Sequence, residues 1–397
     1  MNILRRRVTR VSGSDGKNLW CAGVVGSVQV VTAIVLALTL VSSVQAAVFT
    51  CPSGDSACLI DAINTANENG EENTIQLEAG VYSLTAIDNM TDEANGLPSI
   101  TSSLTIVGAE LLGLPTGEEE ILPPLPVGMT TVIERNALTS PPPFRLFHVA
   151  EAGTLVIERL TLRGGDASVG GGLFNLGTLT IRDSTVVGNR AIVAGGLSNS
   201  GTLTLITSTL TANSGEDVGG GISNSGTVTI TNSTVADNTG ALGGGLFNFG
   251  TITVTNSTIS RNVASFRAGG LLNNGTVSIQ NTILARNISN DSPDCFGSLG
   301  SLGNNLVGME MGCTTTVLPG AGDLDRTGNP LLAELSDIGT PGFGHFPPRP
   351  DSPAIDAGND AVCPDTDQLG RGRLMVLANA PHICDIGAIE FHPDIDL

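Results

Sequence analysis

A tandem repeat of 24 or 25 residues restricts the fold of this 397-residue chain more than any other feature. Each repeat contains the word Asn-x-Gly-Thr, and another asparagine follows the glycine at a constant distance of twelve residues. Repeats of about 20–50 residues indicate solenoids, propellers or arrays, in which each unit packs on its neighbours. The glycines of the five words are Gly177, Gly201, Gly226, Gly250 and Gly275.

Aliphatic residues alternate with threonine and serine inside each repeat, which is the pattern of a half-buried strand. A propeller blade needs about 40 residues, so two or three short strands per unit favour one coil of a single-stranded parallel β-helix. Coils of this kind stack about 4.8 Å apart, and equivalent residues then lie above one another. We therefore predict an all-β solenoid with a central column of Leu179, Leu203, Val228, Ile252 and Val277.

Asparagine recurs at two positions of the repeat, and both positions are expected at corners of the coil. Glycine and asparagine tolerate left-handed backbone there, and an asparagine can hydrogen-bond to its copy in the next coil. A row of ligand-binding side chains is the alternative, but we favour structural ladders. The ladders are Asn175, Asn199, Asn224, Asn248 and Asn273, and Asn189, Asn213, Asn238, Asn262 and Asn287.

Residues 1–46 have the pattern of a secretory signal peptide. A basic start precedes the apolar run Val30–Val41, and the small-residue end Val44-Gln45-Ala46 follows it. A membrane anchor is the alternative, but it needs about 20 apolar residues, and Gln29 interrupts the stretch. We expect cleavage near Ala46 and a location outside the cell or on its surface.

Without residues 1–46 the chain has 13 arginines, no lysine and 37 acidic residues, a net charge near −24. This charge repels nucleic acids and anionic lipids, so neither is an expected partner. We expect a monomer that does not span a membrane, requires no cofactor and has a surface partner or glycan that the sequence does not identify.

Six cysteines remain after the signal peptide, and an even number in an exported chain indicates disulfides. They form three pairs of near neighbours, which predicts Cys51–Cys58, Cys295–Cys313 and Cys363–Cys384.

The repeats are flanked by segments of other composition. Residues 47–109 should form a capping helix, near Ala57–Gly70, and the first coils. Residues 110–143 are rich in proline and acid and suggest an irregular loop excursion, and residues 144–290 carry the repeats. Residues 291–397 lose the period and suggest an irregular, disulfide-bonded C-terminal cap. Caps protect the open strand edges at the ends of a solenoid.

These segments resemble known bacterial families. The GGGL words, and the Ser-Thr words that precede each corner asparagine, resemble the repeats of polymorphic outer-membrane proteins. The segment "ACLIDAINTANENGEENTIQLEAGVYSLT" is similar to the CSLREA domain, although its cysteine is shifted by one place. Asp351–Phe391 is similar to the choice-of-anchor Q domain. The resemblance implies a right-handed, pectin-lyase-like β-helix that is exported and surface-associated, and it supplies no catalytic residues.

Polysaccharide hydrolysis would need two carboxylates about 5–10 Å apart. Outward positions of the repeat offer no such pair, and Glu216 with Asp217 is better explained as a solvated acidic loop. Arg261 and Arg286 recur on successive coils and could meet an anion, but surface arginines usually face acidic neighbours. Sugar sites also use aromatic platforms, whereas Phe174 and Phe247 are better explained by packing.

A calcium site in the C-terminal segment is conceivable, because Asp356, Asp365, Asp367 and Asp385 provide hard oxygen ligands. We favour the alternative that these acids accept hydrogen bonds from irregular backbone and pair with Arg371 and Arg373. The sequence thus predicts a non-catalytic, adhesin-like rod. A carbohydrate-active enzyme, either a polysaccharide lyase or a glycoside hydrolase, and a calcium- or ligand-binding scaffold remain the alternatives.

Overall fold

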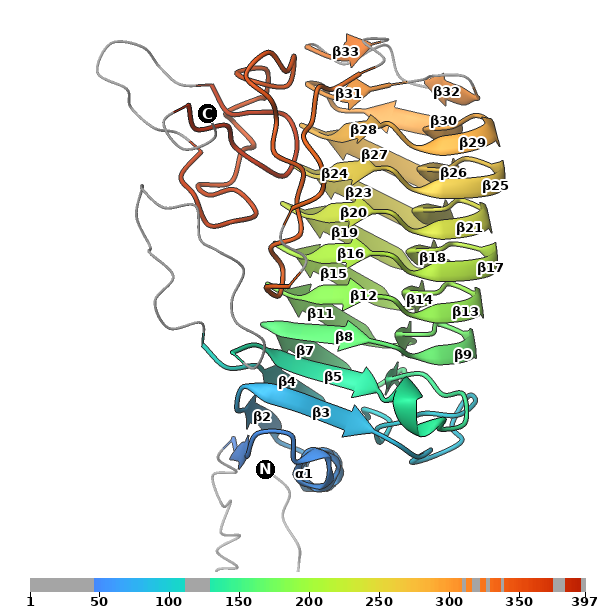
Figure 1. Ribbon diagram of the computed structural model, residues 1–397, viewed down its shortest axis with the longest axis vertical. Helices are drawn as coiled ribbons and strands as arrows, with labels where there is room; N and C mark the ends of the chain where they lie inside the picture. The colour runs from blue at the N-terminus through green and yellow to red at the C-terminus, as the bar shows by residue number, and fades with distance from the viewer. Residues whose placement is uncertain are drawn as a thin grey trace, which may run out of the picture. The chain divides into compact units, whose positions relative to one another are not determined.

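The computed structural model describes residues 46–110, 129–308, 312–315, 322–325, 329–336, 339–373 and 383–393. These residues form a parallel β-solenoid with one α-helix, which confirms the predicted fold class (Figure 1). The predicted signal peptide, apart from Ala46, lies outside the described residues.

A regular coil contributes one strand to each of four stacks of parallel strands, which we number I to IV. Along the chain, each coil passes through stack IV first and then through stacks I, II and III. Stack I contains β1 (Val48–Cys51), β2 (Glu72–Leu77), β4 (Ser103–Val107), β7 (Thr154–Glu158), β11 (Thr178–Arg182), β15 (Thr202–Ile206), β19 (Thr227–Thr231), β23 (Thr251–Thr255) and β27 (Thr276–Gln280). Stack II contains β3 (Gly80–Leu84), β5 (Thr131–Arg135), β8 (Leu160–Arg163), β12 (Thr185–Val187), β16 (Thr209–Thr211), β20 (Thr234–Ala236), β24 (Thr258–Ser260), β28 (Ile283–Ala285), β31 (Leu306–Val307) and β33 (Leu324–Asp325).

Stacks III and IV complete the coils. Stack III contains β9 (Asp166–Val169), β13 (Arg190–Val193), β17 (Ser214–Val218), β21 (Thr239–Leu242), β25 (Val263–Arg267) and β29 (Ile288–Asp291). Stack IV contains β6 (Phe147–Val149), β10 (Leu173–Asn175), β14 (Leu197–Asn199), β18 (Ile222–Asn224), β22 (Leu246–Asn248), β26 (Leu271–Asn273), β30 (Cys295–Ser301) and β32 (Cys313–Thr315).

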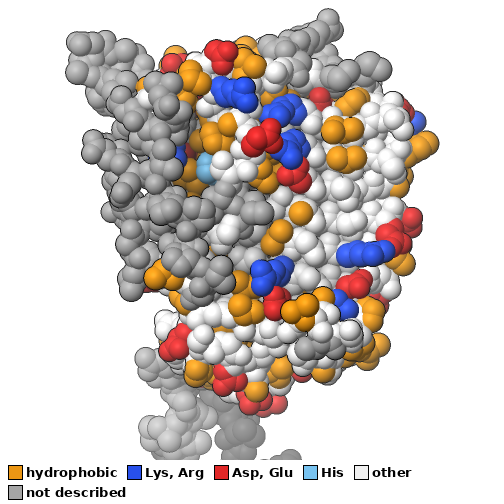
Figure 2. All heavy atoms as spheres, viewed as in Figure 1, with side chains coloured by type: hydrophobic (Ala, Val, Ile, Leu, Met, Phe, Trp, Pro, Cys, Tyr) orange, Lys and Arg blue, Asp and Glu red, His pale blue; other side chains and the backbone are white. Residues whose placement is uncertain are grey.

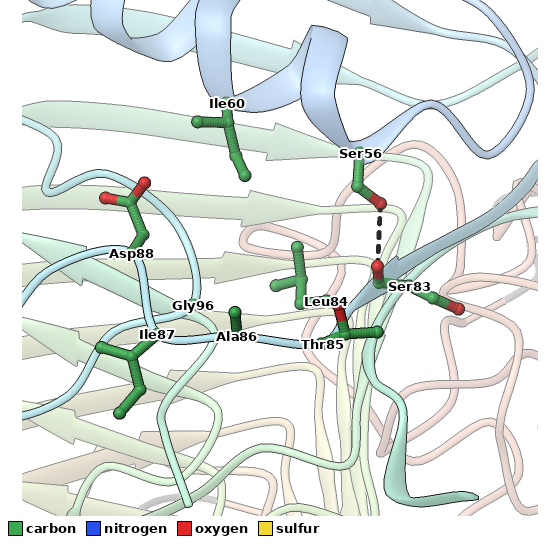
Figure 3. A pocket seen from close by; sticks show the side chains of 9 residues that line it. All are labelled: Ser56, Ile60, Ser83, Leu84, Thr85, Ala86, Ile87, Asp88 and Gly96. Atoms are coloured by element: carbon green, nitrogen blue, oxygen red, sulfur yellow. Dashed lines mark hydrogen bonds between the residues drawn. The ribbon is translucent and has the colours of Figure 1, made fainter. Parts of the chain in front are cut away.

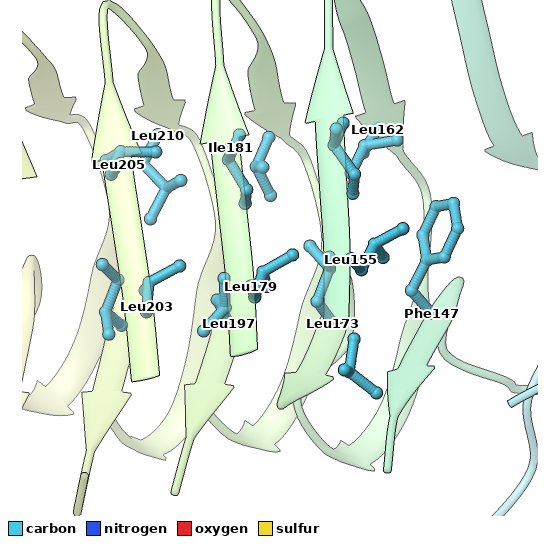
Figure 4. Packing of buried hydrophobic residues seen from close by; sticks show 14 of the residues in the cluster. Phe147, Leu155, Leu162, Leu173, Leu179, Ile181, Leu197, Leu203, Leu205 and Leu210 are labelled. Atoms are coloured by element: carbon cyan, nitrogen blue, oxygen red, sulfur yellow. The ribbon is translucent and has the colours of Figure 1, made fainter. Parts of the chain in front are cut away.

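The aliphatic residues pile in columns inside the solenoid, as predicted. Register partners in stack I join Leu179 to Leu203, Leu203 to Val228, Val228 to Ile252 and Ile252 to Val277. All five side chains are buried, and Figure 4 shows the adjoining leucines and isoleucines filling the interior between the strands. Burial of an aliphatic side chain contributes about 1.5–3 kcal/mol, so the column is a major source of stability.

Both asparagine positions form hydrogen-bonded ladders. Asn175 Nδ2 donates to Asn199 Oδ1 over 2.7 Å, and Asn213 Nδ2 donates to Asn238 Oδ1 over 3.0 Å. The same bond recurs between further neighbours in each column, and the ten side chains are buried. A ligand-binding role for these asparagines is therefore excluded by their burial.

The repeat glycines serve a purpose other than left-handed backbone. A Cβ on Gly226 would lie 2.1 Å from the carbonyl oxygen of Gly201, so these glycines permit close approach of successive coils. Left-handed corners fall at other positions, including Thr207 (φ 44°) and Asn232 (φ 47°). Glycine and asparagine do adopt this conformation at corners of the repeat, as at Gly243 (φ 61°) and Asn256 (φ 46°), but the ladder asparagines and the glycines of the Asn-x-Gly-Thr words do not.

Helix α1 (Ser56–Asn69) lies at the N-terminal end of the coils, where the capping helix is predicted. Its Asp55 N-cap accepts from the backbone N–H of Cys58 over 3.0 Å, and left-handed Gly70 ends it. The described part of the segment predicted as an excursion, residues 110 and 129–143, is less irregular than expected: it includes strand β5 and the short 3₁₀ helix η1 (Ala137–Thr139). β5 pairs with β3 and β8, and its Ile133 is buried in the core.

The C-terminal region differs most from its prediction. The coils continue beyond residue 290 through β30, β31, β32 and β33, although the sequence period is lost. The described residues after 328, which we call the C-terminal strap (329–336, 339–373 and 383–393), run alongside stack II rather than forming an end cap (Figure 1).

Three disulfides join the cysteines as the sequence spacing predicts: Cys51–Cys58, Cys295–Cys313 and Cys363–Cys384. The first links the entering strand to α1, the second lies in the last coils, and the third closes a loop of the strap.

Candidate functional site

The strap is held by a column of outward-facing threonines on stack II. The backbone N–H of Gly342 donates to Thr185 Oγ1 over 2.9 Å, and Thr209 Oγ1 donates to the carbonyl of Gly344 over 2.8 Å. The next two threonines of the column bond to Gln368 and Ala388 in the same way. All four threonines are buried as a result. In this fold, a ladder of outward threonines can therefore dock a segment that offers one polar group per coil.

A buried ionic network fixes the middle of the strap. Arg373 Nη1 donates to Glu390 Oε2 over 3.1 Å, and Arg373 Nη2 donates to Asn232 Oδ1 over 3.2 Å. Burial raises the pKa of Asp385 to about 6, and burial together with the charge of Asp385 raises the pKa of Glu390 to about 8. Shifts of this kind are typical of catalytic acids, but Asp385, Glu390 and Arg373 have no exposed surface with which to reach a substrate.

The four aspartates considered as calcium ligands do not converge. Asp367 Oδ1 accepts from two backbone N–H groups of the following turn, at 2.8 and 2.9 Å, and Asp385 Oδ1 accepts from the N–H of Asp356 over 2.7 Å. Within the described ranges, no group of three or more histidine, cysteine or acidic side chains is arranged to hold a metal. Asp367 and Asp385 thus serve as backbone acceptors, and Arg373 pairs with Glu390 rather than with one of the four aspartates.

The two stacked arginines also belong to the strap interface. Arg261 pairs with Asp237 on the neighbouring coil, over 2.9 Å, and with Glu334 of the strap. Arg286 Nη1 donates to the carbonyl of Leu332 over 3.0 Å. Neither guanidinium is therefore arranged as a site for an external anion.

The aromatic column of stack IV is packed rather than open. Phe247 and Leu272 are buried against Val218 and Leu242 of stack III, and the guanidinium of Arg267 lies 4.3 Å from the ring centroid of Phe296. Phe174 lies under Arg145, whose guanidinium is 5.0 Å from its ring centroid. Phe174 and Phe247 are therefore packing residues, the explanation that we favour from the sequence.

A second charge cluster, in which the basic side chains are buried and the acidic ones exposed, lies beside Phe174 and was not found from the sequence. Arg145 Nη1 donates to the carbonyl of Asp92 over 2.6 Å, and Nη2 donates to Glu93 Oε2 over 3.0 Å. Burial lowers the pKa of both Arg145 and His148, although the nearby carboxylates oppose the shift. His148 is only 1% exposed, so the cluster anchors the loop around Asp92 and does not present a general base to a substrate.

A cavity of about 180 Å³ lies between α1 and the chain after β3 (Figure 3). Ser56 Oγ donates to the carbonyl of Ser83 over 3.1 Å at one side, and Ile60 and Ile87 line the other. Asp88 is the sole ionisable residue among its lining side chains, so the cavity lacks the pair of groups that acid–base catalysis requires.

The face formed by stacks II and III carries arginines next to acids rather than a patch of one sign (Figure 2). Arg190 pairs with Glu216, and Arg267 pairs with Asp291 over 2.7 Å. Glu216 and Asp217 lie on strand β17 and not on a loop as predicted, but both are exposed. Charge pairs of this kind are typical of an ordinary solvated surface.

Stack I has a different surface. The first outward residue of each strand is threonine in six consecutive coils. The second outward residue, two positions further along the strand, is threonine in four of them, with Val156 before and Ser278 after. We call this surface the threonine face; its residues are Thr154, Thr178, Thr180, Thr202, Thr204, Thr227, Thr229, Thr251, Thr253, Thr276 and Ser278.

The threonine face is open to solvent. Its first column is exposed from Thr178 to Thr276, its second is half-buried, and no described residue hydrogen-bonds to its hydroxyls. Charges occur only at its edge, where Arg182 and Glu158 form an ion pair over 3.8 Å. The sequence signal is the word Thr-x-Thr after four of the five repeat glycines and Thr-x-Ser after Gly275, a pattern that by itself indicates only the solvent side of a strand. This face is the candidate functional site.

Comparison with protein-family models, with curated proteins and with solved structures finds no match to this chain. Across the part of the chain that the structure describes, no helix is long and apolar enough to cross a membrane.

Proposed function

We propose that this chain is an exported, non-catalytic, adhesin-like module that attaches to an extended surface through its threonine face. One observation carries the proposal: an uncharged array of exposed and half-buried hydroxyl side chains, ten threonines and one serine, persists over six coils of a chain with 38 acidic and 18 basic residues. An uncharged face on so acidic a protein suits a neutral partner, because the face offers a charged partner no opposite charge to bind.

Repetition supplies the affinity that a single threonine lacks. One hydrogen bond contributes about 0.5–1.5 kcal/mol, whereas millimolar binding already requires about 4 kcal/mol. A partner with the same repeat can engage many coils at once, and linked weak contacts gain affinity through effective concentration. The strap supports this mode of binding, because it forms a hydrogen bond with a threonine hydroxyl of stack II at each of four successive coils.

Export is supported by the three disulfides, since such bonds form and persist in oxidising compartments. A binding rather than catalytic role is supported by the placement of the acids. Asp385 and Glu390, whose pKa values are raised, are buried, and the exposed Glu216 is paired with Arg190.

The test is co-sedimentation of the full-length protein with crystalline, mineral and polysaccharide surfaces and with intact bacterial cells. We expect binding to at least one surface and a loss of about tenfold or more, equivalent to about 1.4 kcal/mol, when Thr204 and Thr229 are both replaced by glutamate. Thr239→Glu on stack III is the matched control, because Thr239 is also exposed on a strand, and it should bind like the wild type.

Three results would contradict the proposal. The first is equal binding by the wild type and the Thr204→Glu/Thr229→Glu variant, and the second is no binding to any surface. The third is release of reducing ends or unsaturated sugars from a polysaccharide, if a single carboxylate substitution abolishes this release, which would favour the enzyme alternative.

A further inference from the structure

We infer that the surface bound by the threonine face is crystalline water, so that ice is a ligand of this protein. The inference rests on the proposed function and specifies its partner. It follows from the spacing, rigidity and composition of the threonine face, and from the contrast between this face and the rest of the surface.

The threonine face is a two-dimensional lattice. Adjacent strands of a sheet lie about 4.8 Å apart, and alternate residues of one strand lie about 6.6 Å apart. The register is unbroken from β7 to β27, so the first column runs through five such steps, or about 24 Å. Water oxygens on a prism face of hexagonal ice also form a rectangular lattice. One of its repeats is close to the spacing between strands, and the other is somewhat longer than the spacing along a strand, a difference that rotation of the threonine side chains can reduce. Hydroxyl groups on this lattice can therefore take positions of the crystal.

Threonine side chains are stiff enough to keep the hydroxyl groups of such a lattice in fixed positions. Its β-branched side chain is stiff about χ1, and each copy stands in the same backbone environment as the copies above and below it. Buried columns directly beneath fix the backbone, since Leu203 and Leu205 of β15 point inward between Thr202, Thr204 and Ile206. Each threonine also adds a methyl group, and rows of methyl groups between rows of hydroxyls restrict the positions that water can occupy.

The composition of the face disfavours other partners. Protein interfaces depend on Trp, Tyr and Arg anchors, and sugar sites depend on aromatic platforms. The threonine face has neither: its nearest aromatic side chain in sequence is Phe249, which projects at the preceding corner of a single coil. A neutral face also has no charged groups with which an ionic polymer could pair. Water is small, uncharged and able both to donate to and to accept from a hydroxyl group.

Strand propensity alone does not explain why threonine is kept. Stack III provides a comparison in the same six coils. Its first outward-facing residues are also exposed or half-buried and lie in register with one another, but they are six different residues: Asp166, Arg190, Ser214, Thr239, Val263 and Ile288. Inward residues are fixed by the core and the asparagines by their ladders, but the exposed threonines have no such contacts. Strand preference of about 1 kcal/mol would also allow Val, Ile or Tyr there. A ligand that recognises threonine itself explains the uniformity.

The test is uptake of the full-length protein into a slowly growing ice front, together with the shape of single ice crystals in its solution. We expect enrichment in the ice fraction and faceted crystals. Thr229→Tyr, which places a bulky ring in the middle of the lattice, should lower the uptake by about tenfold or more, equivalent to about 1.4 kcal/mol. The matched control Thr239→Tyr on stack III should behave like the wild type.

Thr229→Ser provides a second variant, because it keeps the hydroxyl, removes one methyl group and is tolerated on an open strand surface. We expect it to reduce uptake less than Thr229→Tyr does. Equal denaturation midpoints of the variants would show that all of them are folded.

Exclusion of the wild type from ice, or equal uptake of Thr229→Tyr and the wild type, would overturn the inference. If the wild type then still binds another surface through Thr204 and Thr229, the proposed function survives and only its partner is wrong. If it binds no surface, both fail.

Discussion

Replacement of Asn238 by alanine tests whether the asparagine ladders stabilise the solenoid. Asn238 is fully buried, and its Oδ1 accepts from both the backbone N–H and the Nδ2 of Asn213, each over 3.0 Å. Its Nδ2 donates to the carbonyl of Leu210 over 3.0 Å and to Asn262 Oδ1 over 2.9 Å. Alanine removes all of these bonds.

The magnitude follows from the groups left behind. Asn213 Nδ2 keeps its bond to the carbonyl of Val186, and Asn262 Oδ1 keeps the backbone N–H of residue 238. The N–H of Asn213 and the carbonyl of Leu210 each lose a partner in the interior. An unsatisfied buried group costs about 1–3 kcal/mol, so we expect Asn238→Ala to lower the free energy of unfolding by about 2–6 kcal/mol.

The assay is guanidinium unfolding followed by circular dichroism, with the midpoint shift read at an unchanged slope. Asn274→Ala is the control, because Asn274 is an exposed corner residue of the same repeat and should change stability by less than about 0.5 kcal/mol. If the two variants unfolded within this margin of each other, the ladders would contribute little and the reasoning from buried hydrogen bonds would be wrong.

Three further predictions concern other parts of the fold. Gly226→Ala should destabilise the solenoid by more than about 3 kcal/mol, because its Cβ would meet a backbone oxygen at 2.1 Å, whereas Gly372→Ala, with open space around it, should be neutral in the same unfolding assay. Because the folded pKa of Glu390 is raised to about 8, its protonated form adds stability at low pH that is lost as pH rises through 8. The free energy of unfolding should thus fall between about pH 5 and about pH 9, and it should fall less in Glu390→Gln. A fall of equal size in both proteins would show that ionisation of Glu390 is not the cause. Serine at both Cys363 and Cys384 should cost the strap about 3 kcal/mol, since the bond spans 21 residues, and should expose the strap to proteolysis before the coils; simultaneous cleavage of both would show that the two unfold together.

The sequence was sufficient for the solenoid because its contacts are periodic. A residue in a coil meets its equivalent 24 or 25 positions later, so alternation and spacing define the inside, the outside and the column in which Leu203 lies above Leu179. The asparagine ladders follow from the same period, and the disulfide pairs follow from short separations. Within the irregular segment before the repeats the period is absent, and strand β5 was therefore missed.

The tertiary structure alone decided which outward surfaces are free. Thr209 and Thr204 belong to the same repeat and look alike in the sequence, yet the first is buried under Gly344, 135 residues away, and the second faces solvent. No local pattern encodes that difference, because it depends on where a distant, non-repeating strap settles. The strap positions Arg373 and Glu390 for the same reason. A repeating sequence determines its own stacking, whereas the exposure of each face depends on contacts between segments that share no period.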